Sequence, residues 1–101
     1  MEKSLKILKL LRKIPRGKVT TYGALAKAAH SSPRAVGQVM RNNAHPELYP
    51  CYKCVSSSGR LGGYSGQVKG KMIDKKVALL KKDGITIENG KIDLSRYLHR
   101  F

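Results

Sequence analysis

Two short helical segments on either side of the tight turn Ser31-Ser32-Pro33 narrow the choice of fold for this chain. Residues 22–29 follow Thr21, whose hydroxyl is a suitable N-cap for a helix. The second segment, residues 33–42, has Ser32 as its N-cap and Pro33 at the first helical position, where the missing N–H costs nothing. Two helices joined in this way, the second carrying small and basic residues, are typical of a helix-turn-helix.

Further helices and short β segments are expected around this pair. Leucines at helical spacing predict an amphipathic helix over residues 2–13, and an apolar stripe predicts another over 71–82 that ends near Gly84. The β-branched run 19–21 is a candidate strand.

Two hairpins complete the expected fold. Arg60-Leu61 is predicted to return alongside the run YPCYKCV (residues 49–55) as a small wing, and Asn89-Gly90 is a strong turn signal for a second hairpin over 85–94. We therefore expect a mainly α fold with small β, a winged helix-turn-helix DNA-binding domain with a short C-terminal β-hairpin. Residues 1–101 are expected to form this single domain.

The charge of the chain favours an anionic partner. It carries 21 Lys+Arg against 6 Asp+Glu, a formal net charge of +15, which is typical of proteins that bind nucleic acid. No apolar run approaches the roughly 18 residues of a membrane span, so no membrane partner is expected. Two cysteines three positions apart cannot cross-link distant loops, and a reducing, cytoplasmic setting is predicted.

Cys51, which follows a proline inside the YPCYKCV run, has several alternative interpretations. A structural zinc site needs four ligands, and two cysteines with three irregularly spaced histidines fit it poorly. A thioredoxin-type C-x-x-C pair with Cys54 belongs near a βαβ pattern, which is absent from the predicted elements. A buried structural cysteine is the plain alternative. The fourth interpretation, a nucleophilic thiolate, is favoured by the many cations of the chain, including nearby Lys53.

Three ordered motifs carry a family resemblance. The segments IPRGKVTTYGALAKAA, RAVGQVMRNNAHPELYPCYKCV and SSSGRLGGYSG run from Ile14 to Gly66, and the match resumes at LLKKDG. Together they resemble the C-terminal active-site domain of the O6-alkylguanine-DNA alkyltransferases, the methylated-DNA–protein-cysteine methyltransferases. The hallmark of that family is Pro-Cys-His-Arg-Val.

The resemblance implies a winged helix-turn-helix that binds double-stranded DNA through the minor groove and flips the damaged guanine out of the stack. Cys51 is then the acceptor that takes the alkyl group from O6-alkylguanine irreversibly, in a single turnover. No cofactor and no metal are implied, and a monomer is expected.

Individual residues follow from the same resemblance. Tyr22 matches the tyrosine that hydrogen-bonds the base and helps to protonate the departing guanine. Arg34 matches the arginine that fills the stack in place of the flipped nucleotide, and Asn43 matches the asparagine that ties the helix-turn-helix to the active-site loop. Each also has a structural alternative: a core-capping aromatic, a solvated helix charge and a helix cap, respectively. The remaining expected residues are Ala35, Gly37, Gln38 and Arg41 for DNA binding, and Tyr64, Ser65 and Lys53 for the base pocket.

Three positions depart from the family pattern: Tyr52 stands in place of histidine, Lys53 in place of arginine and Asp83 in place of glutamate. The family histidine draws the proton from the cysteine through a water, and neutral tyrosine is a poorer base at pH 7. Tyr52 and Asp83 are kept as catalytic candidates, but a slower or more alkaline-dependent reaction is expected. An unchanged pH profile in a Tyr52→His variant would refute this.

Two rival functions remain open. Alkyltransferase-like proteins bind alkylated DNA without repairing it, and a weakened relay at Tyr52 fits that behaviour. An ordinary winged-helix transcription regulator is the other rival, although it would prefer a defined sequence and is typically dimeric. Cys54 stands where valine is usual, so a disulfide or thiol-exchange role with Cys51 is a further hypothesis.

Overall fold

A computed structural model describes residues 2–61 and 71–101, apart from the side chains of residues 2, 3, 71 and 72. Tyr64 and Ser65, two of the expected pocket residues, lie outside this range. In chain order the elements are α1 (Glu2–Leu11), β1 (Thr20–Thr21), α2 (Tyr22–Ala28), α3 (Pro33–Arg41), the 3₁₀ helix η1 (Cys51–Lys53), β2 (Cys54–Val55), α4 (Lys71–Lys82) and α5 (Leu94–Tyr97).

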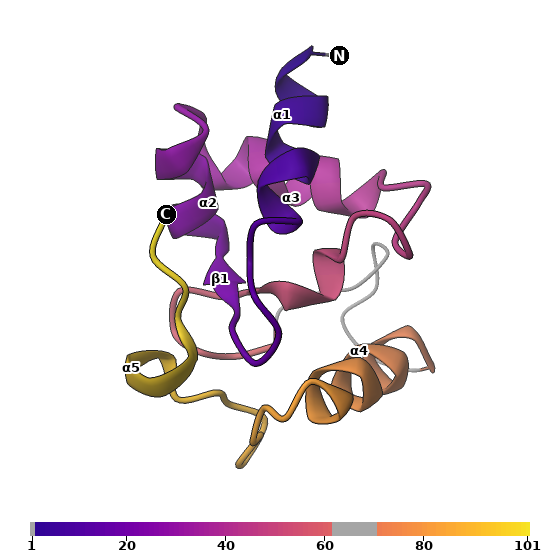
Figure 1. Ribbon diagram of the computed structural model, residues 1–101, viewed down its shortest axis with the longest axis vertical. Coiled ribbons are helices and arrows are strands. Elements are labelled where there is room, and N and C mark those ends of the chain that lie inside the picture. The colour runs from indigo at the N-terminus through magenta and orange to yellow at the C-terminus, as the bar shows by residue number, and fades with distance from the viewer. Residues whose placement is uncertain (1, 62–70) are drawn as a thin grey trace.

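The helix-turn-helix formed by α2 and α3 begins each helix with the predicted cap. The hydroxyl of Thr21 accepts a hydrogen bond from the N–H of Ala24 at 3.0 Å, and that of Ser32 accepts one from Ala35 at 3.1 Å. Pro33 occupies the first turn of α3. Helix α1 packs across this pair, so the three helices form one half of the molecule, with α4 and α5 in the other half (Figure 1).

The small sheet differs from the predicted wing. β1 and β2 pair in parallel, with Thr20 opposite Cys54 and Thr21 opposite Val55. The predicted hairpin return is limited to one hydrogen bond from the Ser56 N–H to the Arg60 carbonyl, and Arg60 then pairs with Lys91. Among the described residues, the second arm of the predicted wing is therefore not paired with β2, because Arg60 bridges to Lys91 instead.

The C-terminal region contains the predicted turn and one helix that was not predicted. Asn89 and Gly90 both have positive φ, 53° and 72°, and Glu88 pairs with Lys91 across them. This is the geometry that favours Asn-Gly in two-residue hairpin turns. The pairing stops there, because Asp93 caps α5 by accepting a hydrogen bond from the Ser95 N–H at 3.0 Å.

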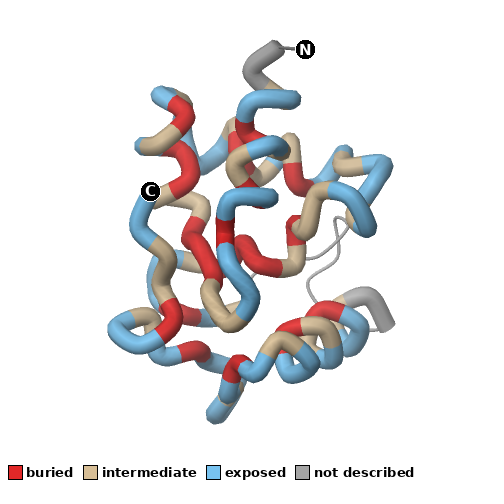
Figure 2. Tube along the Cα trace, in the orientation of Figure 1, coloured by how far each residue is buried: buried red, intermediate tan, exposed pale blue. Residues whose placement is uncertain are grey.

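The buried side chains form two clusters. Figure 2 shows buried segments in both halves of the molecule. The first joins α1, α2, α3 and the Cys51 turn, and the second joins α4 to the C-terminal segment. The first cluster contains Ile7, Leu11, Ile14, Leu25, Ala26, Ala29, Val36, Met40, Cys51 and Cys54; the second contains Val19, Val55, Leu80, Ile85, Ile92 and Tyr97. Both cysteines therefore lie in the cluster that also holds the helix-turn-helix. Within the described part of the chain, no helix has the length and apolar character to cross a membrane.

Candidate active site around Cys51

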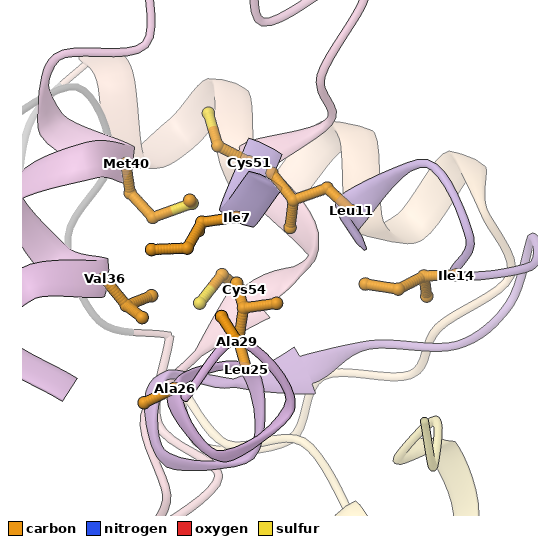
Figure 3. Packing of buried hydrophobic residues seen from close by; sticks show 10 residues of the cluster. All are labelled: Ile7, Leu11, Ile14, Leu25, Ala26, Ala29, Val36, Met40, Cys51 and Cys54. Carbon is orange, nitrogen blue, oxygen red and sulfur yellow. The ribbon is translucent and has the colours of Figure 1, made fainter. Parts of the chain in front are cut away.

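Cys51 begins the 3₁₀ turn that follows Pro50, and its N–H donates to the carbonyl of Tyr49 at 2.7 Å. Its side chain is 5% exposed and belongs to the first buried cluster. A nucleophile must be reached by its substrate, and in this structure the Cys51 thiol is almost fully covered. The thiol nevertheless lies at the margin of the cluster: in Figure 3 its sulfur points away from the other side chains, whereas the sulfur of Cys54 points in among them.

Cys54 is more deeply enclosed than Cys51. It is 0% exposed, and burial raises the pKa of its thiol to about 12, so this thiol stays protonated at neutral pH. Both cysteines are free thiols, which leaves the proposed disulfide or exchange role of Cys54 a hypothesis. Of the two, Cys51 is the thiol that a substrate approaching from outside would meet first.

Tyr22 is the first residue of α2, and its partly exposed ring packs against the cluster that holds both cysteines. Burial raises the pKa of its hydroxyl to about 12, and the neighbouring Cys54 and Cys51 add to this shift. The hydroxyl is therefore neutral at pH 7 and available to donate a hydrogen bond. The packing of the Tyr22 ring against the cluster also fits the structural alternative, in which Tyr22 is an aromatic that caps the core.

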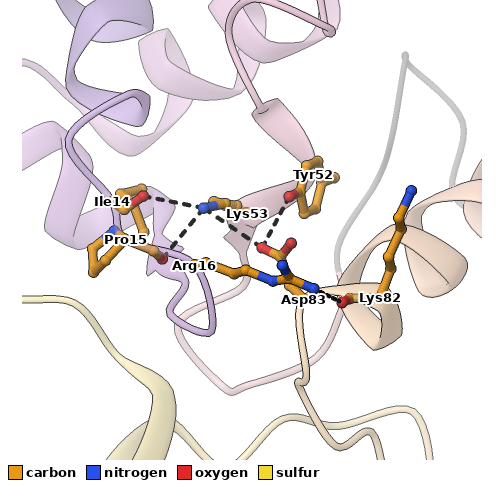
Figure 4. A network of polar contacts seen from close by, with 7 residues as sticks. All are labelled: Ile14, Pro15, Arg16, Tyr52, Lys53, Lys82 and Asp83. Atoms are coloured by element: carbon orange, nitrogen blue, oxygen red, sulfur yellow. Dashed lines mark hydrogen bonds and ion pairs between the residues drawn. The ribbon is translucent and has the colours of Figure 1, made fainter.

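Tyr52 and Asp83, the two residues expected to replace the family relay, meet directly. The Tyr52 hydroxyl donates a hydrogen bond to Oδ2 of Asp83 at 2.9 Å (Figure 4). Asp83 immediately follows α4, so this bond joins the Cys51 turn to a helix 31 positions away in sequence. It also orients the phenol oxygen of Tyr52.

Lys53 makes contacts that the sequence did not indicate. Its side chain is buried, and its ammonium donates to the carbonyls of Ile14 and Pro15 at 3.1 and 3.3 Å. It also forms an ion pair with Oδ2 of Asp83 at 3.5 Å (Figure 4). These contacts hold the α1–β1 loop against α4 and give Lys53 a structural role. Its place in a base pocket stays a prediction.

Lys76 is the residue of this site that the sequence interpretation missed. Its side chain is 0% exposed, and its ammonium donates to the carbonyls of Cys54 at 2.7 Å and Leu61 at 2.6 Å. Burial lowers its pKa to about 8, and the electrostatic influence of the nearby Cys54 and Cys51 opposes that shift. Lys76 is therefore a buried basic residue that acts electrostatically on both cysteines. The signal was present, because Lys76 lies three residues after Ile73 and four before Leu80, on the apolar stripe of α4.

The outer surface of α3 carries the residues expected to contact DNA. Arg34, Gln38 and Arg41 are exposed, whereas Ala35 and Gly37 are half-buried. A Cβ atom built on Gly37 would meet no atom within 4 Å. Glycine inside a helix costs roughly 1 kcal/mol relative to alanine. Among the described residues, no neighbouring atom requires a glycine at position 37.

Asn43 connects the end of α3 to the Cys51 turn. Its Nδ2 donates to the carbonyl of Tyr49 at 2.8 Å, and its Oδ1 accepts from the N–H of His45 at 3.1 Å. The expected tie between the helix-turn-helix and the cysteine loop is thus present as geometry. Because Cys51 N–H binds the same Tyr49 carbonyl, the position of the thiol depends on Asn43.

Comparison with known proteins decides the family. Residues 2–85 match the family described as 6-O-methylguanine DNA methyltransferase, DNA binding domain. The chain belongs to this family. A bifunctional methyltransferase/endonuclease of Picrophilus torridus is 49% identical over 90 residues, which cover 87% of the chain but 28% of that relative. The matching domain is named for DNA binding, and its expected place as a C-terminal active-site domain stays a prediction.

Two solved structures place this 6-O-methylguanine DNA methyltransferase domain among related folds. The O6-methylguanine-DNA methyltransferase from Pyrococcus kodakaraensis KOD1 has a TM-score of 0.73 and 38% identity, covering 84% of this chain and 47% of its own. The S. pombe ATL in complex with DNA has a TM-score of 0.78 and 29% identity, covering 99% and 96%. The mainly helical fold with a small sheet is therefore confirmed. The chain spans less than half the length of the curated relatives that it matches.

Proposed function

We propose that this protein binds double-stranded DNA through α3 and repairs O6-alkylguanine by transferring the alkyl group to Cys51. The observation that carries the proposal is the physical connection between these two parts. Asn43, at the end of α3, and Cys51 both bind the carbonyl of Tyr49, so the DNA-binding helix and the acceptor thiol are fixed relative to each other. Such fixed geometry is what a reaction on a bound base requires.

The transfer is a displacement at carbon. The thiolate of Cys51 attacks the alkyl carbon, a carbon–sulfur bond forms, and the bond between that carbon and guanine O6 breaks. The electron pair of the broken bond stays with the guanine, which then takes up a proton. Tyr22, neutral at pH 7 and packed beside the cysteines, is the proposed hydrogen-bond donor to the departing base.

Before the attack, the Cys51 thiol must give its proton to an acceptor, and the resulting thiolate needs a stabilising charge. Tyr52 is held by Asp83 beside the Cys51 turn, and we assign it the role of orienting the water that takes up the thiol proton, although it is a weak base. Lys76 supplies the buried cation near the thiols. In place of the histidine relay, we therefore assign orientation of the water to Tyr52 and stabilisation of the negative charge on the thiolate to Lys76.

The burial of Cys51 adds a requirement to this reaction. At 5% exposure the thiol cannot meet a base without movement of the side chains around it. The flipped guanine must therefore displace part of the wall near Tyr22 and Tyr52, which are both half-buried. The free energy for this opening has to come from DNA binding, which predicts little reaction with a free alkylated base.

The test is intact-mass measurement after incubation with duplex DNA containing O6-methylguanine. We expect one added methylene per protein, located at Cys51 by peptide mapping. Cys51→Ala is expected to abolish the addition, while the matched variant Cys54→Ala keeps it. An unmodified mass with a duplex that is demonstrably bound would refute alkyl transfer.

The same measurement addresses a second candidate function, recognition of alkylated DNA without transfer. The similarity to S. pombe ATL over almost the full length of both chains, together with the burial of Cys51, favours this alternative. It predicts a higher affinity for methylated than for unmodified duplex, an unchanged mass, and the same affinity in Cys51→Ala.

A further inference from the structure

A hollow of about 580 Å³ lies where the C-terminal ends of α1 and α2 meet the last residues of the chain. Leu10 and Ala28 contribute apolar lining. Three basic residues, Lys13, Lys27 and Arg100, also line it. No carboxylate side chain is among the described residues that line it.

One residue of this hollow occupies a strained position. His30 lines the hollow and has a φ of 53° in the turn that ends α2, where the N–H of His30 binds the Lys27 carbonyl and that of Ser31 binds Ala26. Helix α4 ends with the same two bonds, but there the residue of positive φ is Gly84, the usual choice. A side chain is thus kept at the end of α2 where glycine fits better, and this side chain faces the hollow.

The tail side of the hollow is held in place by the backbone. Val19 donates to the Tyr97 carbonyl at 2.8 Å and accepts from the His99 N–H at 2.7 Å. The ring of Phe101 stands edge-on to the His99 ring at a centroid distance of 4.9 Å, and Phe101 is 46% exposed. An aromatic surface therefore stands next to the cations in a preformed arrangement.

The hollow is separate from the proposed DNA-binding surface. No described residue of α3 is among those that line it. In Figure 1 the C-terminus lies beside α2, while α1 crosses in front of α3. A ligand in the hollow would therefore leave Arg34 and Arg41 accessible.

We propose that this hollow is a second nucleic-acid site, which binds a single-stranded nucleotide segment. Its phosphates lie against Lys13, Lys27 and Arg100, and a base packs on Phe101. Cations beside an exposed aromatic ring are the usual combination for single strands, whose bases are free to stack. Duplex DNA offers phosphates but no free base face, so it is expected to bind here more weakly.

The test is an NMR titration of the full chain with a lesion-free single-stranded oligonucleotide, the duplex of the same sequence, the free mononucleotide and inorganic phosphate. We expect the single strand to shift the amide signals of Lys27, His30 and Arg100 at the lowest concentration. Shifts confined to α3, or equal effects of inorganic phosphate and the oligonucleotide, would overturn the proposal. Because no lesion is present, the outcome is independent of alkyl transfer.

Two charge variants separate the hollow from the overall charge of the protein. The triple variant K13A/K27A/R100A is expected to lower the salt dependence of single-strand binding by about two, since each phosphate contact contributes about 0.7 to the slope. The control K75A/K81A/K82A removes the same charge from exposed positions on α4. Equal slopes in the two variants would overturn the proposal.

Two further variants test the aromatic and strained residues. Phe101→Ala is expected to weaken single-strand binding about tenfold, as the loss of one stacked base does, with little effect on duplex binding. His30→Gly is expected to raise the midpoint of thermal unfolding and yet weaken single-strand binding. Unchanged binding in both variants contradicts the site.

Discussion

At the scale of single residues, the hydrogen bond from Tyr52 to Asp83 joins the turn that carries Cys51 to the end of α4. Asp83 also pairs with the ammonium of Lys53, so one carboxylate holds two neighbours of the thiol. Both Lys53 and Asp83 are largely shielded from solvent, with side chains 8% and 14% exposed. Removing one partner of such a pair is expected to cost more free energy than the hydrogen bond contributes, because the remaining buried charge then has neither a partner nor water around it.

Tyr52→Phe tests this arrangement. The variant keeps the ring and removes the donor to Asp83, and we expect it to lower the free energy of unfolding by about 1 to 3 kcal/mol. Urea denaturation measures the change. Asp83→Asn provides the comparison, because it also removes the ion pair with Lys53 and is expected to cost more. Equal stability of Tyr52→Phe and the parent protein would contradict the structural role of the bond.

Lys76 gives a second residue-scale prediction, on pH dependence. Its pKa is lowered to about 8 by burial, below the roughly 10.4 of an unfolded lysine. Between these values the unfolded chain holds more protons than the folded one, so stability rises with pH. The contribution is fully present above the unfolded pKa and is lost as the pH falls toward 8. The full change is on the order of 3 kcal/mol.

Urea denaturation between pH 8 and 9 checks this in the parent protein and in Lys76→Met. Cys54, whose pKa is raised to about 12 in the folded protein, adds an opposite slope from about pH 8.5, where the unfolded thiol titrates. Both proteins carry Cys54, so the difference between their slopes reports Lys76. We expect the rise with pH to disappear in the variant. The overall stability of Lys76→Met is a separate quantity, because it also leaves the carbonyls of Cys54 and Leu61 without their donor.

At the scale of elements, α3 has a well-capped N-terminus but carries in its interior a glycine, which lowers helix stability. Ser32 and Pro33 give it a well-formed N-terminus, whereas Gly37 lies in its middle and faces open space. A glycine that no neighbouring atom requires is explained by an external partner that approaches the backbone closely. In the proposed function that partner is the minor groove of DNA.

Gly37→Ala separates the two effects. We expect the variant to gain about 0.5 to 1 kcal/mol in the free energy of unfolding and to bind duplex DNA more weakly. Fluorescence anisotropy and urea denaturation measure the two quantities. Gly59→Ala is the contrasting control, because its φ is 87° and a Cβ would lie 2.6 Å from the Ile92 carbonyl oxygen, so it should lose stability. Tighter DNA binding by Gly37→Ala would contradict the assignment.

At the scale of the whole molecule, Cys51 lies where the helical half meets the half built around α4. The Asn43 link and the Tyr52–Asp83 bond approach it from these two sides. Access to the thiol therefore depends on how tightly the two halves are held together around it. Opening of this junction is a step that the proposed reaction requires and that the closed structure resists.

Peptide-resolved labelling with iodoacetamide tests the closed state. We expect Cys51 to react much more slowly in the native protein than in urea, and Cys54, at 0% exposure, to react more slowly still. Addition of duplex DNA containing O6-methylguanine should block labelling of Cys51 by converting the thiol. Rapid native labelling of Cys51 would show that no opening step is needed.

The sequence by itself determined the local elements and the family motifs. Caps, turn residues and apolar spacing act over a few positions, so the starts of α2 and α3, the end of α4 at Gly84 and the Asn89-Gly90 turn followed from them. The proximity of Tyr52 and Asp83 followed from the family resemblance. These short-range signals do not determine which segments distant in sequence pair with each other.

Tertiary structure decided the rest. The parallel pairing of β1 with β2, the burial of Cys51, the redirection of Lys53 toward Ile14 and Pro15, and the buried ammonium of Lys76 all depend on segments far apart in the chain. A basic side chain is expected on the surface unless buried carbonyl oxygens are there to accept hydrogen bonds from it. Those carbonyls come together only when the two halves of the molecule pack.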